Sequence, residues 1–541
     1  MKEKEPSLSS NNIGESPATS DHEPPTDYTR GWRLAALVIA LGFAIFLVAI
    51  DMTIISTAIP SISSEFKSIA SNGWYGSAFF LTNAAMQAPC GKLYQFFPLK
   101  RSFVISMTVF EIGSLICALA KCPATLIIGR AIAGAGAAGV AVGAYTILAV
   151  SAAPHQRSAL TAIFGVSYAV ASFVGPLLGG AFTTSSTWRW CFWINLPVGG
   201  FTLGTVLLVF YPPVGSAPKP ASWRSILVQT DIMGGYPRHW RYEWGGSSNR
   251  GITGCDWDFG WFCHLGLLFG LHEWYLGDTA MICRSLISRK AVLMNSSVIF
   301  FLAPSFFILL YYLPLYFQVV QGLSATASGV RTVPLVLGCG ILSALSGVYM
   351  SKIGYGMPPM LLGSAMTTIA CGIFSTINQH SNTGFSIGIQ VLAGIGVGIA
   401  CQVPIIVNQA SVEQSELSSV TAITLFFQMT GGSIFLQLAQ SLLTNAIATY
   451  LMSHKDSSGG HVDPMAVLHV GASEVLLKFD PDTSAVVLEA YMSGLRSSFL
   501  LATTLAGVAT IFALFTTFGS IKKASKIQAT KIYVQESSKT V

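Results

Sequence analysis

The sequence predicts an all-α polytopic membrane protein, and three observations support this fold class. Of the 541 residues, 52% are hydrophobic and only 10% are charged, whereas soluble chains carry about 25% charged residues. The mean hydropathy is +0.59, and long apolar runs recur from residue 34 to residue 519. Because a helix needs about 20 apolar residues to cross the hydrocarbon core, this pattern excludes a soluble globular enzyme.

The first segment is polar and rich in Ser, Pro and Glu, so we expect residues 1–32 to form a disordered tail. It lacks the charged start and short apolar run of a cleavable signal. The first apolar run is therefore expected to act as the insertion signal.

Twelve apolar runs are long enough to span a membrane. The expected spans lie near residues 33–59, 74–90, 102–120, 124–149, 160–182, 191–211, 292–313, 327–350, 357–377, 384–407, 419–443 and 494–519. The only long loop between them is expected at 444–493, outside the cytoplasm, where six acidic residues indicate a solvated surface.

Basic residues cluster before the first span and in alternate loops after it, which sets the orientation by the positive-inside rule. They are Arg30, Arg33, Lys92, Lys100, Arg101, Arg157, Lys219 and Arg224. Both tails, 1–32 and 521–541, are therefore expected to be cytoplasmic. Arg289 and Lys290 must lie on the same side as Arg224, so residues 225–290 cross the membrane zero times or twice. We favour zero crossings, because the one long apolar run there, 261–277, holds two histidines and a glutamate.

The segment GAGAAG (134–139) matches a dinucleotide-binding loop by its letters alone. That site needs a preceding strand and an acidic residue about 20 positions later, but the glycines lie in mid-span and the next acid is Asp231. The small residues Ala135, Gly139 and Gly143 instead form a stripe for close helix packing. GPLLG (175–179) and GIGVG (394–398) predict similar surfaces.

Three charged residues fall within the apolar runs of the first half, Asp51, Glu111 and Arg130. One aspartate at the bilayer centre costs about 2.5–3.5 kcal/mol on an insertion scale. At 1.5 Å per residue, Arg130 lies about 9 Å and Asp51 about 15 Å from the outer face. The two side chains can therefore pair if their helices are neighbours, and such a pair can be functional or purely structural.

Glu111, within FEIGS, is expected near mid-membrane, either as a protonated packing residue or in proton exchange. Desolvation favours the neutral carboxyl, whereas a nearby guanidinium favours the carboxylate. A carboxyl whose arginine partner moves can therefore bind and release a proton, which is the chemistry that a proton-coupled carrier needs.

Uncharged polar side chains also fall within the spans, and each alone is explained by helix–helix hydrogen bonding. Together with nearby aromatic residues they predict a cavity that accepts amphiphiles. The residues expected to line it are Asn83, Gln87, Gln318, Gln402, Phe427 and Gln428.

Several blocks resemble one family when taken in order. AIDMTIISTAIPSI (49–62) resembles the first-helix motif of the drug:proton antiporters of the major facilitator superfamily. GKLYQFFPLKRSF (91–103) stands where this family has its loop between helices two and three, with Gly91, Lys92, Lys100 and Arg101. GRAIAGAGAAGV (129–140) resembles the fourth-helix motif, whose arginine is Arg130.

The later blocks are typical of the fungal fourteen-span branch. GVSYAVASFVGPLLGGAF (165–182) resembles the fifth-helix antiporter motif, with Gly165, Gly175, Pro176, Gly179 and Gly180. WRWCFWINLPVGG (188–200) and YYLPLYFQVVQGLSATASGVRTVP (311–334) are similar to further segments of that branch. Together the likenesses cover most of residues 33–445.

The resemblance implies the major facilitator fold, with six-helix halves at 33–212 and 291–520 and alternating access to a central cavity. It implies export of hydrophobic toxins, drugs or secondary metabolites, driven by proton entry. The resemblance also places helices one and four at the cavity, which supports the proximity of Asp51 and Arg130. By the same analogy Arg130 takes part in proton coupling, and the stretch 165–182 shapes the gate.

Two features depart from the family pattern. Gln95 stands near the place of the usual loop aspartate, which removes a possible charge interaction. In the linker 213–290, the two extra helices of the branch are degraded between remnants of their edges. We hypothesise a mis-spliced or frame-shifted segment between about 235 and 265, and the alternative is a true twelve-span variant.

Other functions are also weighed. A vacuolar or plasma-membrane carrier of amino acids or siderophores and a non-transporting membrane sensor remain alternatives. The sequence contains no HExxH, GxSxG or phosphate-loop motif, so nothing in it indicates an enzyme or an ATP-driven pump. We expect neither cofactor nor metal, since the ten cysteines form no CxxC pair. The expected partners are an amphiphilic substrate, protons and the lipid bilayer, and we expect no nucleic-acid partner. The protein is expected to be a monomer in the plasma membrane.

Overall fold

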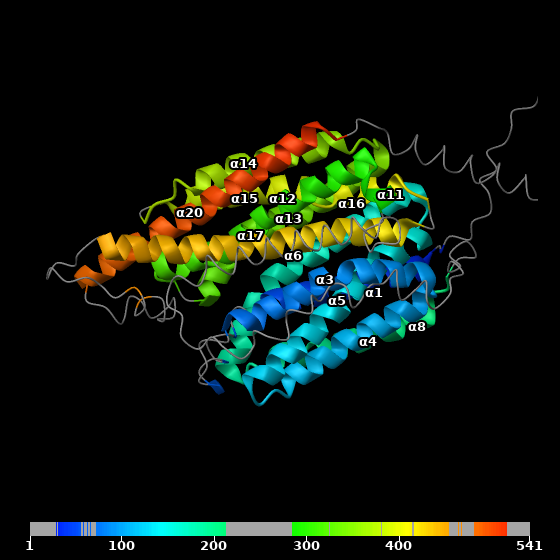
Figure 1. Ribbon diagram of the computed structural model, residues 1–541, viewed down its shortest axis with the longest axis horizontal. Coiled ribbons are helices and arrows are strands. Elements are labelled where there is room, and N and C mark those ends of the chain that lie inside the picture. Colours follow the sequence, from blue (N-terminus) through cyan, green and yellow to red (C-terminus); the bar gives the residue numbers. More distant parts are fainter. Residues whose placement is uncertain are drawn as a thin grey trace, which may run out of the picture.

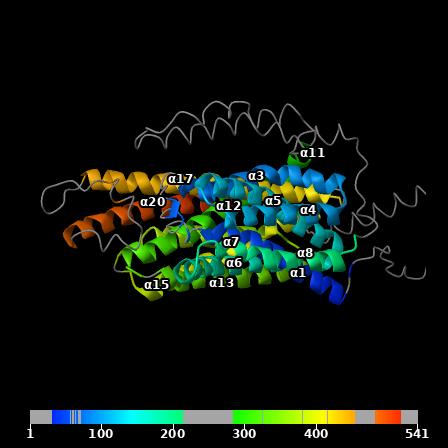
Figure 2. The same ribbon diagram turned by 90° about the horizontal axis from the view of Figure 1, so that it is seen from below.

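The computed structural model describes residues 29, 31–55, 58, 62, 65–66, 72–212, 284–323, 325–379, 381–413, 416–453, 464, 467 and 481–516. These residues form an elongated bundle of long, roughly aligned helices (Figure 1; Figure 2). Large apolar side chains such as Ile105, Leu208 and Leu362 are exposed on its surface, as expected of a surface that faces lipid.

The N-terminal half packs its helices around α5. The elements are α1 (Trp32–Thr53), α3 (Asn72–Phe96), α4 (Leu99–Ala118), α5 (Pro123–Ser151), α6 (Pro154–Ser185), α7 (Trp190–Trp193) and α8 (Asn195–Val209). Pro123 and Pro154 begin α5 and α6, where the missing N–H of proline removes no helical hydrogen bond. Since α1, α3, α4 and α6 all contact α5, this helix is the centre of the half.

The C-terminal half is built in the same way. After the short α11 (Arg284–Ile287) come α12 (Lys290–Leu315), η4 (Tyr316–Val320), α13 (Ala325–Lys352), α14 (Met357–Phe374), α15 (Thr383–Ala400), α16 (Val403–Ala410), α17 (Leu417–Ser453) and α20 (Pro481–Leu514). The turn η4 is π-helical and continues α12 without a break. Helices α15 and α16 together make one span that is interrupted at Cys401 and Gln402.

The predicted twelve-span arrangement agrees with the described residues. Eleven helices, counting α7–α8, α12–η4 and α15–α16 as continuous, are long and apolar enough to cross a membrane. The remaining bundle helix, α3, is 25 residues long but less apolar, because it carries Asn83, Gln87 and Lys92. The chain is thus a multi-pass helical membrane protein.

The prediction of a loop over 444–493 is wrong at both of its ends, where the chain is helical. Helix α17 continues to Ser453 and α20 begins at Pro481, so most of the described part of that range is helical. The Tyr450 hydroxyl donates a hydrogen bond to the carboxylate of Glu489 and links the two extensions. Hydropathy marks only the part of a helix that lies in hydrocarbon, whereas backbone hydrogen bonding lets the helix continue beyond it.

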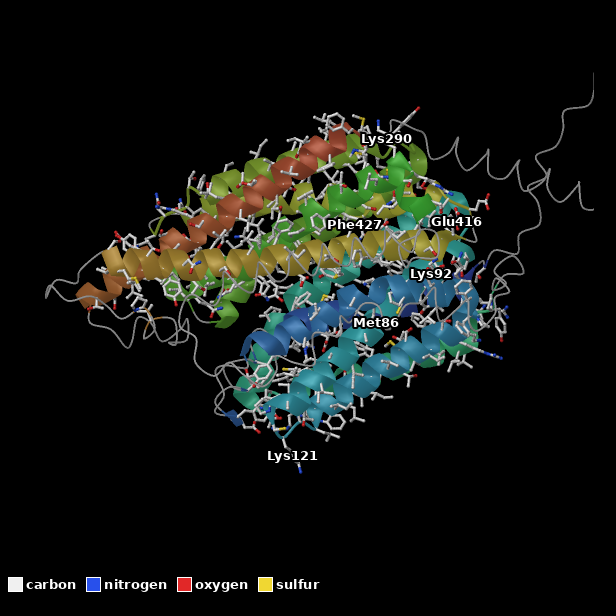
Figure 3. All side chains as sticks on the ribbon, in the orientation of Figure 1. Met86, Lys92, Lys121, Lys290, Glu416 and Phe427 are labelled. Atoms are coloured by element: carbon white, nitrogen blue, oxygen red, sulfur yellow. The ribbon has the colours of Figure 1, made fainter. Side chains whose placement is uncertain are left out.

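Charged residues at the bundle ends agree with the predicted topology. Lys92, Lys290 and Glu416 lie toward one end of the bundle, and Lys121 lies at the opposite end (Figure 3). Arg289 forms an ion pair with Glu416 at 3.1 Å, which joins the start of α12 to the start of α17. Lys290 therefore lies at the same end as Lys92, as the even number of crossings between them requires.

The glycine stripes serve helix packing, as predicted. A Cβ added to Gly136 would overlap the backbone of Phe110 on α4, and one added to Gly143 would overlap Tyr94 on α3. Gly394 and Gly398 lie in the same way against the backbone of α13. Ala135 is only half-buried, so Gly136, Gly139 and Gly143 form the closely packed face of α5.

The tails 1–28 and 517–541 and the linker residues 213–283 lie outside the described residues. The predictions of disordered tails and of a degraded linker, including the hypothesis of a mis-spliced segment at 235–265, fall there and stay predictions.

Candidate functional site

A buried ion pair joins α1 to α5 inside the N-terminal half. Asp51 is on the last turn of α1 and Arg130 is two turns into α5, and both side chains are 0% exposed. The Arg130 Nη1 donates a hydrogen bond to the Asp51 Oδ2. The proximity predicted from helix depth is therefore confirmed.

Arg130 is held by more than its carboxylate partner. Its Nε donates to the backbone carbonyl of Tyr75 on α3 at 2.9 Å. Its guanidinium carbon lies 4.4 Å from the ring centroid of Phe79 and 6.0 Å from that of Phe192. Aromatic faces attract a cation in a site from which water is excluded, so the guanidinium keeps favourable contacts even when Asp51 is neutral.

The second oxygen of Asp51 is bound by Asn195, which the sequence analysis missed. The Asn195 Nδ2 lies 3.2 Å from the Asp51 Oδ1 and 3.1 Å from the Ser114 Oγ. Asn195 is the first residue of α8 and is fully buried. Its position in the block INLPVGG was the available signal, because one amide in an apolar segment needs a buried partner.

Glu111 is half-buried on α4, one helical turn before Ser114. Within the described part of the chain, neither of its carboxyl oxygens has a hydrogen-bond partner. The carboxyl lies against the backbone of α8 at Gly199, where an added Cβ would overlap the Glu111 Oε1. Glu111 is therefore near the ion pair but does not join it.

The predicted antiporter motif runs along α6, a continuous helix that contains Pro176. Gly165 lies against Ser343 of α13 and Gln402, and Gly175 lies against Thr53 of α1. Gly179 is buried, whereas an added Cβ at Gly180 would meet nothing within 4 Å. The motif thus joins α6 to α1 within its own half and to α13 across the two halves.

The residues of the loop between α3 and α4 lie at the predicted cytoplasmic end. Gly91 allows α3 to approach Ala422 and the Ser418 carbonyl of α17 closely. Lys92 is buried, and Arg101 is exposed. Lys100 Nζ donates to the Leu207 carbonyl at 2.7 Å and so ties α4 to α8.

Gln95, which replaces the usual aspartate, still contacts the other half. It accepts a hydrogen bond from the Ser419 hydroxyl at 3.4 Å. Nearby, the Tyr145 hydroxyl of α5 donates to the Gln402 Oε1 at 3.1 Å. Gly347 of α13 lies against Ser158 and Ala162 of α6. The halves are therefore closely packed at their cytoplasmic ends, and α3 and α17 diverge towards the other end (Figure 1).

The six predicted cavity residues do not gather in one cluster. Gln87 donates to Asn83 at 2.9 Å, and both are buried on α3. Gln318 lies in η4 near the outer end of its span, whereas Gln402 lies nearer the cytoplasmic end. Phe427 contacts the Phe300 ring at 6.0 Å between centroids, and its neighbour Gln428 is half-buried on α17.

The C-terminal half contains a neutral counterpart of the ion pair. Asn295 of α12 donates to Asn408 of α16 at 2.9 Å, and Asn408 donates to Thr424 of α17 at 2.9 Å. Asn408 is fully buried, and Asn295 and Thr424 are nearly or fully buried. This amide network joins three helices without any charge.

Comparison with known proteins identifies the family. The family model described as "Major Facilitator Superfamily" matches residues 41–436. The chain belongs to the major facilitator superfamily. Its described helices agree with that fold, and the match includes every motif residue discussed above.

Curated relatives of this superfamily are found in fungi. A Penicillium sp protein named "MFS-type transporter grgE" is 37% identical over 512 residues, which cover 92% of this chain and 89% of that protein. The "MFS-type efflux pump MFS1" of Arthroderma benhamiae is 35% identical, with 93% and 95% covered. The "Aspyridones efflux protein" of Neocamarosporium betae is 36% identical, with 92% and 90% covered.

Solved structures show the same fold at low sequence identity. A bacterial homolog of the human lysosomal transporter Spinster, in an inward-facing and occupied conformation, aligns with a TM-score of 0.58 at 16% identity, covering 90% of this chain and 97% of the other. The proton:xylose symporter XylE aligns with a TM-score of 0.57 at 12% identity, covering 91% and 99%.

Proposed function

We propose that this major facilitator protein exports hydrophobic or amphiphilic small molecules, such as toxins, drugs or secondary metabolites, in exchange for protons. The buried pair of Asp51 and Arg130 carries the proposal. A fully desolvated carboxylate is costly unless it is paired, so protonation of Asp51 and separation from Arg130 favour each other. Relatives named as efflux pumps support the export direction.

The coupling step follows from the contacts of the pair. A proton that enters from the outer side binds to the Asp51 carboxylate and weakens its bond to Nη1 of Arg130. Arg130 keeps the Tyr75 carbonyl and the Phe79 ring, whereas α1 loses its charged link to α5. Because α1 also contacts α6 of the antiporter motif, the protonation state of Asp51 biases the interface between the two halves.

The remaining properties belong to the same proposal. The carrier uses the proton gradient without a cofactor and acts as a monomer within the lipid bilayer. The plasma membrane is the proposed location, because export from the cell requires it, and the vacuolar membrane is the alternative. It binds no nucleic acid, since the net charge of +6 is small and its basic residues lie mostly at helix ends.

The test uses inverted membrane vesicles with an acidic interior, a panel of amphiphilic toxins and a pH-sensitive dye. Wild-type protein is expected to release protons only when a substrate is added. Asp51→Asn, which keeps the side-chain shape but cannot carry a transferable proton, is expected to abolish this release. Glu413→Gln, at an exposed position before α17, is the matched carboxyl-to-amide control and should behave as wild type.

Other outcomes distinguish the alternatives. Proton release with amino acids or siderophores, but with none of the amphiphiles, would overturn the proposed substrate class. Substrate uptake that persists unchanged in Asp51→Asn would overturn the role of the ion pair. Stable binding of a compound without movement of the compound or of protons would favour a membrane sensor.

A further inference from the structure

The contact between α4 and α8 encloses a second carboxyl, that of Glu111, which the ion pair of Asp51 and Arg130 does not explain. Ser114 and Glu111 are three residues apart on α4, and Asn195 and Gly199 are four residues apart on α8, so each pair shares a helix face. At the outer level Asn195 joins Ser114 to Asp51. One turn nearer the cytoplasm, the Glu111 carboxyl lies directly against Gly199.

The charges around this contact do not balance if both carboxyls are ionised. Asp51 already takes the positive charge of Arg130. Helix α8 carries no charged residue, and Arg130 is the only charged residue of α5. On α4 itself the other charges are Lys100 and Arg101, near its start. Among the described residues, Glu111 thus has no cation of its own at its level, and neither of its oxygens has a hydrogen-bond partner there.

We propose that Glu111 is a second proton-binding carboxyl, which holds a proton while Asp51 is ionised and loses it while Asp51 is protonated. Except at the step in which both carboxyls hold a proton, the N-terminal half then keeps one carboxylate to balance Arg130, in agreement with the cost of unbalanced charge in a low-dielectric interior. This inference rests on the proposed proton coupling and adds to it the residue from which the proton leaves.

The proton balance closes over one cycle. A proton from the outer side adds to the Asp51 carboxylate, and the Glu111 carboxylic acid then releases its own proton towards the cytoplasm and becomes the carboxylate. On return, the Asp51 proton moves to Glu111, which restores the carboxylate of Asp51 and its bond to Arg130. One proton has then crossed the membrane from the outer side to the cytoplasm. This direction requires the releasing residue to lie nearer the cytoplasm, and Glu111 lies one helical turn closer to it than Ser114.

Asn195 and Gly199 have distinct positioning roles in this arrangement. Asn195 places its amide between Asp51 and the turn of α4 that leads to Glu111. Gly199 leaves the space that the carboxyl occupies, since an added Cβ would overlap the Glu111 Oε1 and lie 3.0 Å from Met107 Cε.

The experiment is infrared spectroscopy of the purified full-length protein in lipid, which separates protonated carboxyl groups from carboxylates without any need for transport. At neutral pH the wild type is expected to show one carbonyl band of a protonated, buried carboxyl. Glu111→Gln removes that band, and Asp51→Asn weakens it several-fold because Glu111 then ionises. Glu413→Gln leaves it unchanged, because that side chain is exposed.

Gly199→Ala supplies a second, independent measurement. It displaces the carboxyl and is expected to shift the band, whereas Gly200→Ala, whose Cβ would meet nothing within 4 Å, leaves it in place. A band that survives in Glu111→Gln, or equal bands in wild type and Asp51→Asn, would overturn the proposal. These spectra do not depend on a substrate, so they can fail while proton-coupled export holds, or hold while export fails.

Discussion

The two halves of this protein solve the same packing problem with different chemistry. In the N-terminal half, α1 and α5 are joined by the charged pair Asp51 and Arg130. In the C-terminal half, the corresponding first and fourth helices of the half, α12 and α16, are joined by the amides Asn295 and Asn408. Among the described residues, all fully buried charged side chains lie in the N-terminal half. Both networks hold helices together, but only the charged one can exchange a proton.

The levels of the two networks differ as well. The ion pair lies near the outer ends of α1 and α5, whereas Asn295 and Asn408 lie near the cytoplasmic ends of their helices. The C-terminal amides are thus close to the region where the halves are tightly packed, and the N-terminal charges are close to the outer side, from which the proposed mechanism draws its protons. In the proposed mechanism, proton coupling therefore belongs to the N-terminal half, and the buried amides of the C-terminal half only hold helices together.

The largest expected effect comes from breaking the charged pair on one side only. Arg130→Met leaves Asp51 buried without its cation, which should lower the free energy of unfolding by about 3–5 kcal/mol and abolish transport. Thermal unfolding in detergent and the vesicle assay measure the two effects. In the double variant Asp51→Leu with Arg130→Met, stability should recover while transport stays absent. If the double variant were as unstable as the single one, unpaired charge would not be the cause.

The comparison of the halves is sharpened by truncating one amide in each. Asn408→Ala and Asn195→Ala should each cost about 1–3 kcal/mol, because buried partners lose a hydrogen bond. Only Asn195→Ala should move the pH midpoint of transport, towards higher pH, because one Asp51 oxygen loses its donor. Thermal unfolding and transport measured from pH 5 to pH 9 test this, and an equal pH shift in Asn408→Ala would contradict the division of roles.

A smaller effect is expected where the halves meet. Gly91→Val should hold α3 away from α17, since an added Cβ already overlaps Ala422. Loss of this contact between the halves should lower the midpoint of thermal unfolding. Thermal unfolding of the full-length protein in detergent gives the midpoint. Gly76→Val, on α3 with no atom within 4 Å of the added Cβ, is the control and should leave it unchanged.

The smallest effect is expected at the outer end of the N-terminal half. Arg189 lies 2.9 Å from the Glu65 carboxylate, and this hydrogen bond lowers the pKa of Glu65 from 4.5. The stabilisation is present above the unfolded pKa and is lost as pH falls through the lowered folded value. Glu65→Gln should therefore matter at pH 7 by less than about 1 kcal/mol, since both side chains are partly exposed.

The acid limb of thermal stability provides the measurement for this surface pair. In wild type the unfolding midpoint should fall more steeply below about pH 4.5 than in Glu65→Gln, with the two curves meeting at the lowest pH. Parallel curves would show that the contact with Arg189 contributes nothing to acid stability.

The sequence by itself determined the fold class, the number of spans and the similar depth of Asp51 and Arg130, which lets the two side chains pair if their helices are neighbours. These follow from local or one-dimensional quantities. Apolar length decides whether a segment crosses the membrane, basic residues decide its direction, and the rise per residue gives the depth of each buried charge. The same reasoning failed at 444–493, because a helix does not end where hydrocarbon ends.

Only the tertiary structure decided which polar groups meet. Asn195 and Ser114 are 81 residues apart, and Asn295 and Asn408 are 113 apart, so no spacing in the sequence indicates their contact. The tertiary structure likewise showed that Gln318 and Gln402 lie apart and that the Glu111 carboxyl lies against Gly199. The physical reason is that a membrane helix fixes the height of a side chain but not the direction it faces, which is set by packing against other helices.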